Sequence, residues 1–249
     1  MSLPEKKIKV AVILAAGMGT RLRSVLRDVP KGFLRIDGLS LIEWSIDKLI
    51  DNGIEKIVIG TGHLSEEYDA LARKIDQVCC VRNDRYASTG SMYTLYNLRD
   101  YINDDFLLLE SDLIYEKSAL DALLSDSHRN IVLSSGRTGS GDEVYLEVDS
   151  ARNLVNVSKD PSRLARIDSE LVGISKLSLP AFERLCAATR DKPGIDYELG
   201  FVGIAKTCPL FVKKVEDLAW SEIDDEDHLR RALQTVYPKI KEREAYEKH

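Results

Sequence analysis

The sequence has few cysteines, no surplus of positive charge and no long apolar run. Its four cysteines, Cys79, Cys80, Cys186 and Cys208, lack the paired spacing of a metal site, which favours buried, reduced thiols. Lysine and arginine number 35 against 41 aspartate and glutamate residues, a net charge of −6. General nucleic-acid binding needs a basic surface, so we expect no nucleic-acid partner.

Membrane and export signals are missing as well. The apolar run from Ile8 to Ala16 is interrupted by Lys9 and ends in glycines, well short of the ~18 residues of a membrane span. No segment resembles a signal peptide. We therefore expect a cytoplasmic protein without membrane contact. The 249 residues, 44% of them hydrophobic, suffice for one large α/β domain with a sizeable core.

Apolar runs and helical periodicities alternate along the first half of the chain. They predict strands at 7–14, 56–60, 77–82 and 106–110, and helices at 41–52, from residue 65 and at 91–102. Shorter strands follow at 131–135, 143–148, 154–157, 172–177 and 218–223, with a hairpin turn at 149–153 and helices at 180–189 and 225–236. Such alternation predicts a mostly parallel sheet that binds ligands at the carboxyl ends of its strands.

Two segments suggest phosphate binding. The loop Leu14-Ala15-Ala16-Gly17-Met18-Gly19-Thr20-Arg21-Leu22 follows the first strand. Its glycines let backbone N–H groups face a phosphate, its alanines let a flat base approach, and its arginine offers guanidinium donors. The segment Val29-Pro30-Lys31-Gly32-Phe33-Leu34 adds a lysine that could reach the same phosphates. Taken singly, these segments could be a tight turn and a surface lysine, because neither the dinucleotide fingerprint nor the Walker loop is completed.

Together, LAAGMGTRL and PKGFL resemble the nucleotidyltransferase family of sugar-nucleotide pyrophosphorylases and small-molecule cytidylyltransferases, whose pattern is LAAG-x-G-x-R-L followed by P-K. The resemblance implies an α/β fold: a three-layer, mostly parallel, Rossmann-like sheet of the nucleotide-diphospho-sugar transferase type. It implies one domain over 1–236, with a small β-hairpin lobe for the acceptor at about 137–200. Residues 237–249 are expected to form a charged tail, in the form of a solvated helix.

The resemblance also implies roles for single residues. The stretch 14–17 would line the base and ribose, Gly19 and Arg21 would hold the β- and γ-phosphates, and Lys31 would neutralise the α-phosphate under attack. The full set expected at the nucleotide is Leu14, Ala15, Ala16, Gly17, Met18, Gly19, Thr20, Arg21, Lys31, Thr89, Gly90, Ser91, Ser111 and Asp112.

Two carboxylates are expected to bind Mg²⁺. The apolar strand 106–110 ends in Ser111-Asp112, and a hard cation that bridges phosphates needs carboxylates at such a place. The resemblance carries the metal-binding role to Asp112 and to Asp224, which follows a late strand. The neighbouring Asp225 suits the N-cap of the next helix, and the choice between Asp224 and Asp225 stays open at this point.

The stretch 83–95 resembles the phosphocholine and 2-aminoethylphosphonate cytidylyltransferases, which carry N-[DP]-x-[YF]-A before small polar residues and a helix. The resemblance implies that Thr89, Gly90 and Ser91 contact the base and ribose, although relatives often carry Asn there. These enzymes are short, as this chain is, and CTP is therefore the expected nucleotide.

The acceptor is expected beside the hairpin lobe. Lys159 follows the hairpin, where the family places a lysine near the acceptor phosphate. Asp142, Glu143, Asp196 and Glu198 are candidates for binding an acceptor ammonium, with helix caps and surface acids as the alternative. An aromatic cage for a quaternary ammonium would favour choline, and its candidate members are Tyr93, Tyr145 and Tyr197.

These patterns predict a Mg²⁺-dependent cytidylyltransferase that transfers CMP from CTP and releases pyrophosphate. The acceptor is a small phosphonate or phosphorylated amino alcohol, with 2-aminoethylphosphonate favoured and phosphocholine next. Arg21, Lys31 and Lys159 are the expected catalytic residues. One alternative is a sugar-1-phosphate nucleotidylyltransferase, although the Gln-Gly segment that usually binds its base is not found. Another is a catalytically silent nucleotide-binding regulatory module. A homodimer is allowed by the sequence.

Overall fold

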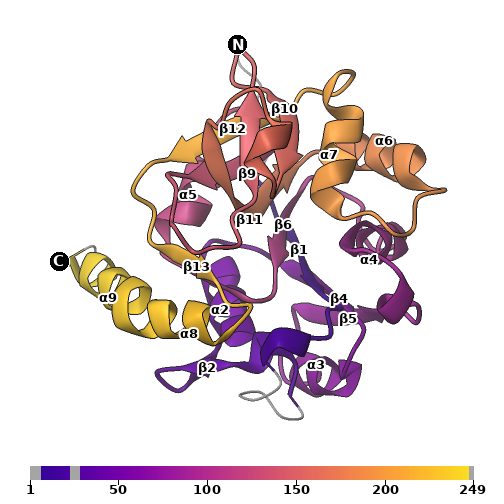
Figure 1. Ribbon diagram of the computed structural model, residues 1–249. Helices are drawn as coiled ribbons and strands as arrows, with labels where there is room; N and C mark the ends of the chain where they lie inside the picture. The colour runs from indigo at the N-terminus through magenta and orange to yellow at the C-terminus, as the bar shows by residue number, and fades with distance from the viewer. Residues whose placement is uncertain (1–6, 23–28, 247–249) are drawn as a thin grey trace.

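The computed structural model describes residues 7–22 and 29–246, which form a central sheet flanked by helices (Figure 1). Its strands are β1 (Val10–Ala15), β4 (Lys56–Thr61), β5 (Val78–Arg82), β6 (Phe106–Glu110), β8 (Ile131–Ser135), β9 (Tyr145–Val148), β10 (Leu154–Ser158), β11 (Ser169–Leu177) and β12 (Phe211–Val215). The main path of the sheet runs β10-β9-β11-β6-β1-β4-β5, and β8 pairs with both β11 and β12.

The first half of the sheet is parallel, as the alternating pattern predicts. Strand β1 pairs in parallel with β4 and β6, and β4 pairs in parallel with β5. The long strand β11 reverses direction: it runs antiparallel to β6, β8 and β9. Strands β9 and β10 form the predicted antiparallel hairpin. The carboxyl ends of β1, β4, β5 and β6 therefore meet at one edge of the sheet.

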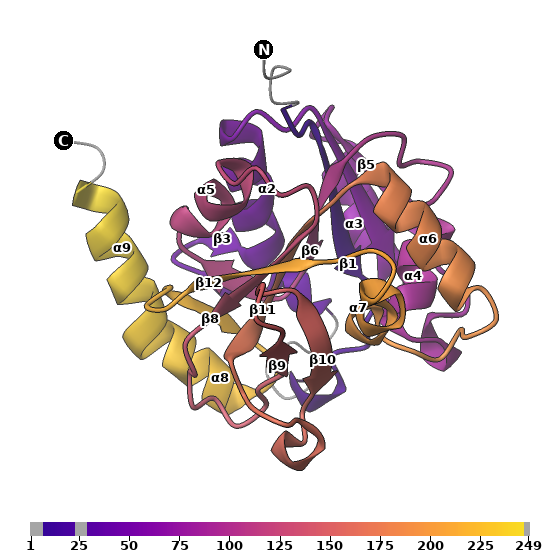
Figure 2. The same ribbon diagram turned by 90° about the horizontal axis from the view of Figure 1, so that it is seen from above.

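Both faces of the sheet are buried, because alternate residues of each strand enter different cores. Ala11 and Ile13 of β1 belong to one apolar cluster, whereas Val12 and Leu14 belong to another. The first cluster includes residues of α2 (Leu41–Asp51), α3 (Ser65–Ala72) and α5 (Ser118–Leu124). The second includes residues of α4 (Ser91–Asn97), α6 (Leu179–Thr189) and α7 (Tyr197–Ala205). This is the predicted three-layer arrangement (Figure 2).

Helix ends differ from the sequence pattern in places. Helix α4 ends at Asn97 rather than at 102. Beyond it the backbone forms tighter turns, in which N–H groups donate to the carbonyl three residues earlier. Helix α3 begins at Ser65 without a side-chain cap, since Leu64 precedes it in a left-handed conformation. The capping box lies instead before α2, where Ser40 and Glu43 bond each other reciprocally. Helix α7 and strand β12 were not predicted from the sequence.

The last part of the chain packs against the domain. Helix α8 (Glu226–Arg231) continues through a π-helical segment (Ala232–Val236) into α9 (Tyr237–Tyr246). Ile240 of α9 is fully buried, and Glu244 pairs with Lys48 of α2 at 2.5 Å. The expected charged tail is thus helical through Tyr246, but it has a packed face, because its apolar residues complete a third small core. Among the described residues, no helix is both long and apolar enough to span a bilayer.

Candidate active site

The loop after β1 borders a cavity of about 360 Å³ at the carboxyl edge of the sheet. Leu22 N–H donates to Gly19 O at 3.1 Å, which closes a short 3₁₀ turn (Thr20–Leu22) at the end of the loop. The residues that line the cavity are Leu14, Ala15, Ala16, Gly17, Met18, Gly19, Thr20, Arg21, Lys31, Tyr68, Tyr86, Thr89, Gly90, Ser91, Thr94, Glu110, Ser111, Asp112, Asp196, Tyr197 and Asp224. Every residue predicted to contact the nucleotide therefore faces one cavity.

Lys31 enters this cavity from a 3₁₀ turn (Lys31–Phe33) that follows Pro30. Its ammonium contacts Asp112 at 2.9 Å and also contacts Asp224. Burial lowers the pKa of Lys31, but the charge and hydrogen bond of Asp112, helped by Glu222, outweigh it and raise the pKa above its ordinary value. Lys31 therefore remains a full positive charge between the two carboxylates.

Asp112 and Asp224 meet because two short strands pair away from the main sheet. Strand β7 (Leu113–Tyr115) pairs antiparallel with β13 (Trp220–Glu222), and Ile223 N–H donates to Asp112 O at 3.0 Å. Asp225 is instead the N-cap of α8, because its side chain accepts a hydrogen bond from His228 N–H at 2.9 Å. Of the two neighbouring aspartates, Asp224 is the one whose side chain contacts Lys31.

Two further carboxylates, Glu110 and Glu222, join this cluster and were missed in the sequence. Side-chain oxygens of Glu110, Asp112 and Glu222 all lie within 4.8 Å of one another. Each glutamate is the last residue of its strand and precedes a predicted metal-binding aspartate by two residues. That spacing is the signal from which both glutamates could have been found.

Burial and the crowding of negative charge raise the pKa values of these two glutamates. Burial, followed by the charges of Glu222 and Asp112, raises the pKa of Glu110 well above its ordinary value. Burial and the charge of Asp112 also raise the pKa of Glu222, against the opposing charges of nearby lysines. The Tyr197 hydroxyl donates to Glu110 at 2.6 Å. The site thus has a surplus of carboxylate oxygens, a donor set that suits Mg²⁺ or an organic cation.

The segment 83–91 is tied to the loop before α7. Gly90 N–H donates to Pro193 O at 2.8 Å, and Ser91 donates from its backbone and its hydroxyl to Asp196 Oδ1, both at 3.1 Å. Tyr197 N–H donates to the Ser91 hydroxyl at 3.0 Å. The Asp196 carboxylate, predicted to bind the acceptor, thus also ties the start of α4 to the loop before α7.

Four predicted acceptor residues lie outside the cavity. Lys159, Asp142, Glu143 and Glu198 are not among the described residues that line it. Lys159 instead pairs with Asp142 at 2.7 Å, and Glu143 accepts from Gly141 N–H at 3.2 Å. Burial raises the pKa of Glu198 to about 7, against its own backbone hydrogen bond, and the charge of Asp196 adds to the rise. Their acceptor-binding roles stay predictions.

A sequence model of the MobA-like NTP transferase domain matches residues 11–190. Choline-phosphate cytidylyltransferase from Streptococcus pneumoniae is 30% identical over 175 residues, 70% of this chain and 72% of that protein. 2-Aminoethylphosphonate cytidylyltransferase from Lancefieldella rimae is 25% identical over 189 residues, 73% of this chain and 72% of that protein.

The solved structure of the inositol-1-phosphate CTP transferase from T. maritima has the same fold. It matches with a TM-score of 0.81 at 22% identity, over 96% of this chain and 98% of that one. This likeness confirms the predicted nucleotide-diphospho-sugar transferase type of fold. The chain therefore belongs to the MobA-like NTP transferase domain family, and the predicted membership among the nucleotidyltransferases is confirmed.

Proposed function

We propose that this protein transfers CMP from CTP to a small phosphonate or phosphorylated amino alcohol and releases pyrophosphate. The observation that carries the proposal is the convergence of Lys31, Asp112 and Asp224 beside the loop of β1 at one cavity. A regulatory module that only binds nucleotide would not need both carboxylates and the lysine in contact. The names of the relatives from Streptococcus pneumoniae and Lancefieldella rimae support a cytidylyl group as the one transferred.

In the proposed reaction, an anionic oxygen of the acceptor attacks the α-phosphorus of CTP in line. The new O–P bond forms as the bond to the β-phosphate breaks, and pyrophosphate leaves with the electron pair. Because the attacking oxygen is already anionic, no general base is required. Lys31 stabilises the charge on the transferring phosphoryl group, and Arg21 binds the leaving pyrophosphate.

Mg²⁺ remains part of the proposal. The carboxylates of Asp112 and Asp224 would hold it, and their all-oxygen donors suit this ion. An ion held there would offset the negative charge of the substrate phosphates. The protein's own residues bind the base, orient both substrates and supply positive charge at the phosphates.

The geometry of the tyrosines favours a primary amine on the acceptor. Tyr197 lines the cavity, but Tyr93 stacks on Tyr96 at 6.4 Å between ring centroids, and Tyr145 lies beside Arg137. Of these three tyrosines, Tyr197 alone is among the described residues that line the cavity, which gives little support to an aromatic cage. An ammonium with N–H donors could instead bond carboxylates such as Glu110, which supports 2-aminoethylphosphonate over phosphocholine.

A panel of substrates tests this proposal. Pyrophosphate release is measured with CTP, UTP, GTP and ATP, each combined with 2-aminoethylphosphonate, phosphocholine, inositol 1-phosphate or glucose 1-phosphate in the presence of Mg²⁺. We expect the highest kcat/KM with CTP and 2-aminoethylphosphonate. A faster reaction of UTP with glucose 1-phosphate would favour the sugar-nucleotide alternative, and no pyrophosphate from any pair would favour the silent module.

Replacing Asp112 should abolish catalysis without unfolding the protein. Asp112→Asn removes one charge that we assign to Mg²⁺ binding, and kcat/KM should fall by about 10³-fold or more. Asp225→Asn is the matched control: it removes a charge one residue from Asp224, yet Asn caps a helix as well as Asp does. Near-normal turnover of the Asp112→Asn protein would contradict the assignment, whereas the control should stay within about threefold of wild type.

A further inference from the structure

The loop between β8 and β9 contacts the active site, because its Asp142 pairs with Arg21, a residue that lines the cavity. We call residues 138–142 the strap. Thr138 is fastened at one end, since its N–H and its hydroxyl donate to the buried Glu170 at 2.7 and 2.8 Å. Gly139 and Gly141 both have positive φ angles, +68° and +96°. The strap is thus hydrogen-bonded to β11 at its start, and its backbone bends at the two glycines.

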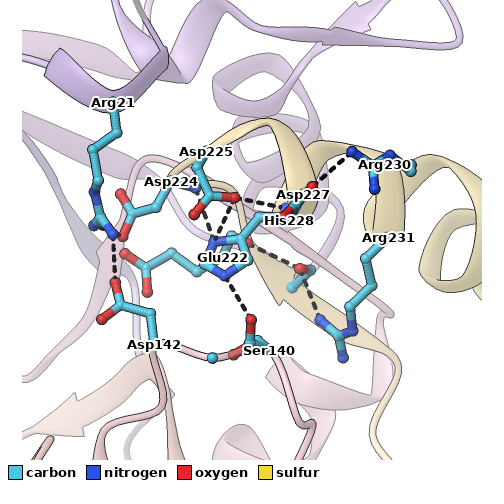
Figure 3. A network of polar contacts seen from close by, with 12 residues as sticks. Arg21, Ser140, Asp142, Glu222, Asp224, Asp225, Asp227, His228, Arg230 and Arg231 are labelled. Carbon is cyan, nitrogen blue, oxygen red and sulfur yellow. Dashed lines mark hydrogen bonds and ion pairs between the residues drawn. The ribbon is translucent and has the colours of Figure 1, made fainter.

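A buried histidine holds the middle of the strap. The backbone N–H of Asp224 can only donate, so His228 Nδ1 accepts from it at 3.3 Å. Nε2 lies 3.3 Å from Ser140 O, which can only accept, so this nitrogen is the donor of the second contact. Figure 3 shows His228 between the start of α8 and Ser140. The strap is therefore docked on His228, which in turn bonds the backbone of Asp224.

Asp142, at the end of the strap, forms ion pairs with two of the cations predicted to bind phosphate. Its Oδ2 accepts a hydrogen bond from Arg21 at 2.8 Å (Figure 3). Its Oδ1 accepts one from Lys159 at 2.7 Å. Burial raises its pKa, but the bonds from Lys159 and Arg21 outweigh this and lower it overall, so the carboxylate is ionised. The two carboxylate oxygens of Asp142 thus bridge Arg21, predicted to bind pyrophosphate, and Lys159, predicted to bind the acceptor. A substrate phosphate would bind the two cations in the same way.

We propose that Asp142 is an internal phosphate mimic that holds Arg21 and Lys159 in the free enzyme and is displaced when substrate phosphates bind. The inference rests on the proposed function, because it takes these two cations to be phosphate ligands. Displacement requires the strap to leave its docked conformation. The apparent affinity for phosphates is therefore the intrinsic affinity multiplied by the fraction of molecules in which the strap is undocked.

Binding of inorganic pyrophosphate tests the mimic without needing an acceptor. Affinity is measured by calorimetry at fixed Mg²⁺ for the wild type, Asp142→Asn and Gly141→Ala. The first variant removes the competing charge. The second keeps every charge but strains the docked strap, because alanine is disfavoured at a φ of +96° and its methyl group has no neighbour within 4 Å to clash with. Both variants should bind pyrophosphate about fivefold more tightly, and the double variant no more tightly than the better single one.

A control separates local competition from loss of charge. Asp160→Asn removes an exposed charge next to Lys159, from a carboxylate that bonds the Ser162 N–H at 2.9 Å rather than a cation of the site. Its pyrophosphate affinity should stay within about twofold of wild type. Tighter binding by Asp142→Asn with no change in Gly141→Ala would overturn the mimic in favour of simple charge removal. Weaker binding by Asp142→Asn would show that Asp142 positions the two cations instead.

The same measurement separates this inference from the function beneath it. Arg21→Ala should weaken pyrophosphate binding at least tenfold if Arg21 is a phosphate ligand. When Arg21→Ala binds as the wild type does, or the wild type does not bind pyrophosphate, the proposed function itself fails. When Arg21→Ala weakens binding but neither strap variant tightens it, the strap proposal alone fails.

Discussion

At the scale of single residues, Lys31 occupies the space between two carboxylates that we assign to a divalent cation. Its side chain is 17% exposed, and those of Asp112 and Asp224 are 12% and 4% exposed. Screening by water is therefore weak, and the carboxylates would repel each other without a cation between them. Lys31 offsets part of their charge in the free protein, and Arg21 also pairs with Asp224 at 2.5 Å. Under the proposed function, Mg²⁺ would therefore compete with Lys31 for the same two side chains until a nucleotide offers Lys31 a phosphate.

Lys31→Met should strengthen Mg²⁺ binding while it lowers activity. Without the ammonium, the paired carboxylates attract the ion more strongly, and we expect several-fold tighter binding of Mg²⁺ in the absence of nucleotide, by calorimetry. The loss of positive charge at the α-phosphate should lower kcat by about 10²-fold or more. Lys9→Met, which removes an exposed lysine paired with Glu55, serves as the control and should change neither quantity. Unchanged or weaker Mg²⁺ binding by Lys31→Met would contradict the competition.

At the scale of elements, the cavity depends on loops that are bonded together rather than on the sheet alone. Strand β1 leads into the glycine-rich loop on one side of the cavity, whereas the start of α4 and the loop before α7 line another side. Their contact is very close: a Cβ added at Gly90 would lie 2.1 Å from Ile195 O and 2.5 Å from Ile195 C. Backbone atoms cannot move aside as a flexible side chain can, so this contact requires glycine.

Gly90→Ala should therefore destabilise the protein and weaken nucleotide binding together. We expect a loss of about 2 kcal/mol in the free energy of unfolding from overpacking, seen as a Tm lower by roughly 5 °C. The KM for CTP should rise because Thr89 and Ser91 line the cavity. Gly194→Ala, in the same contact region, is the control, since its added methyl group would meet nothing within 4 Å. Equal Tm values for the two variants would show that the contact relaxes freely.

At the scale of the whole molecule, the acid-rich site should make stability depend on pH. Burial raises the pKa of Glu198 to about 7, above the ordinary 4.5, so the folded protein binds this proton more tightly than the unfolded chain does. The stabilising effect of protonation is complete below pH 4.5 and is lost as the pH rises through about 7.

Glu198→Gln removes this pH dependence. The variant should gain stability over the wild type by an amount of the order of 2 kcal/mol at pH 8, a figure reduced for the partial exposure of the side chain. At pH 4 the two proteins should be nearly equal. The measurement is the free energy of unfolding in urea at both pH values. The same difference at pH 4 and pH 8 would contradict the raised pKa.

Much of the framework could be predicted locally. Strands β1, β4, β5 and β6 were predicted because their apolar runs are continuous, and α2 because its apolar residues recur at helical spacing. Helix α7 was missed, since its residues are apolar almost all round and give no helical face. The packing of α9 was missed because Ile240, its one buried side chain among those that the structure describes, lies between charged residues and depends on a pocket built by distant segments.

The sequence by itself determined the glycine-rich loop after the first strand, the lysine after Pro30 and the parallel half of the sheet, because backbone geometry and side-chain period act over a few residues. Tertiary structure decided which charges meet. The pairing of β7 with β13 brings Asp112 to Asp224, and with them Glu110 to Glu222. The strap brings Asp142 to Arg21, 121 positions earlier in the chain. Such contacts depend on how distant strands pair and where their connections cross, and no local pattern specifies that.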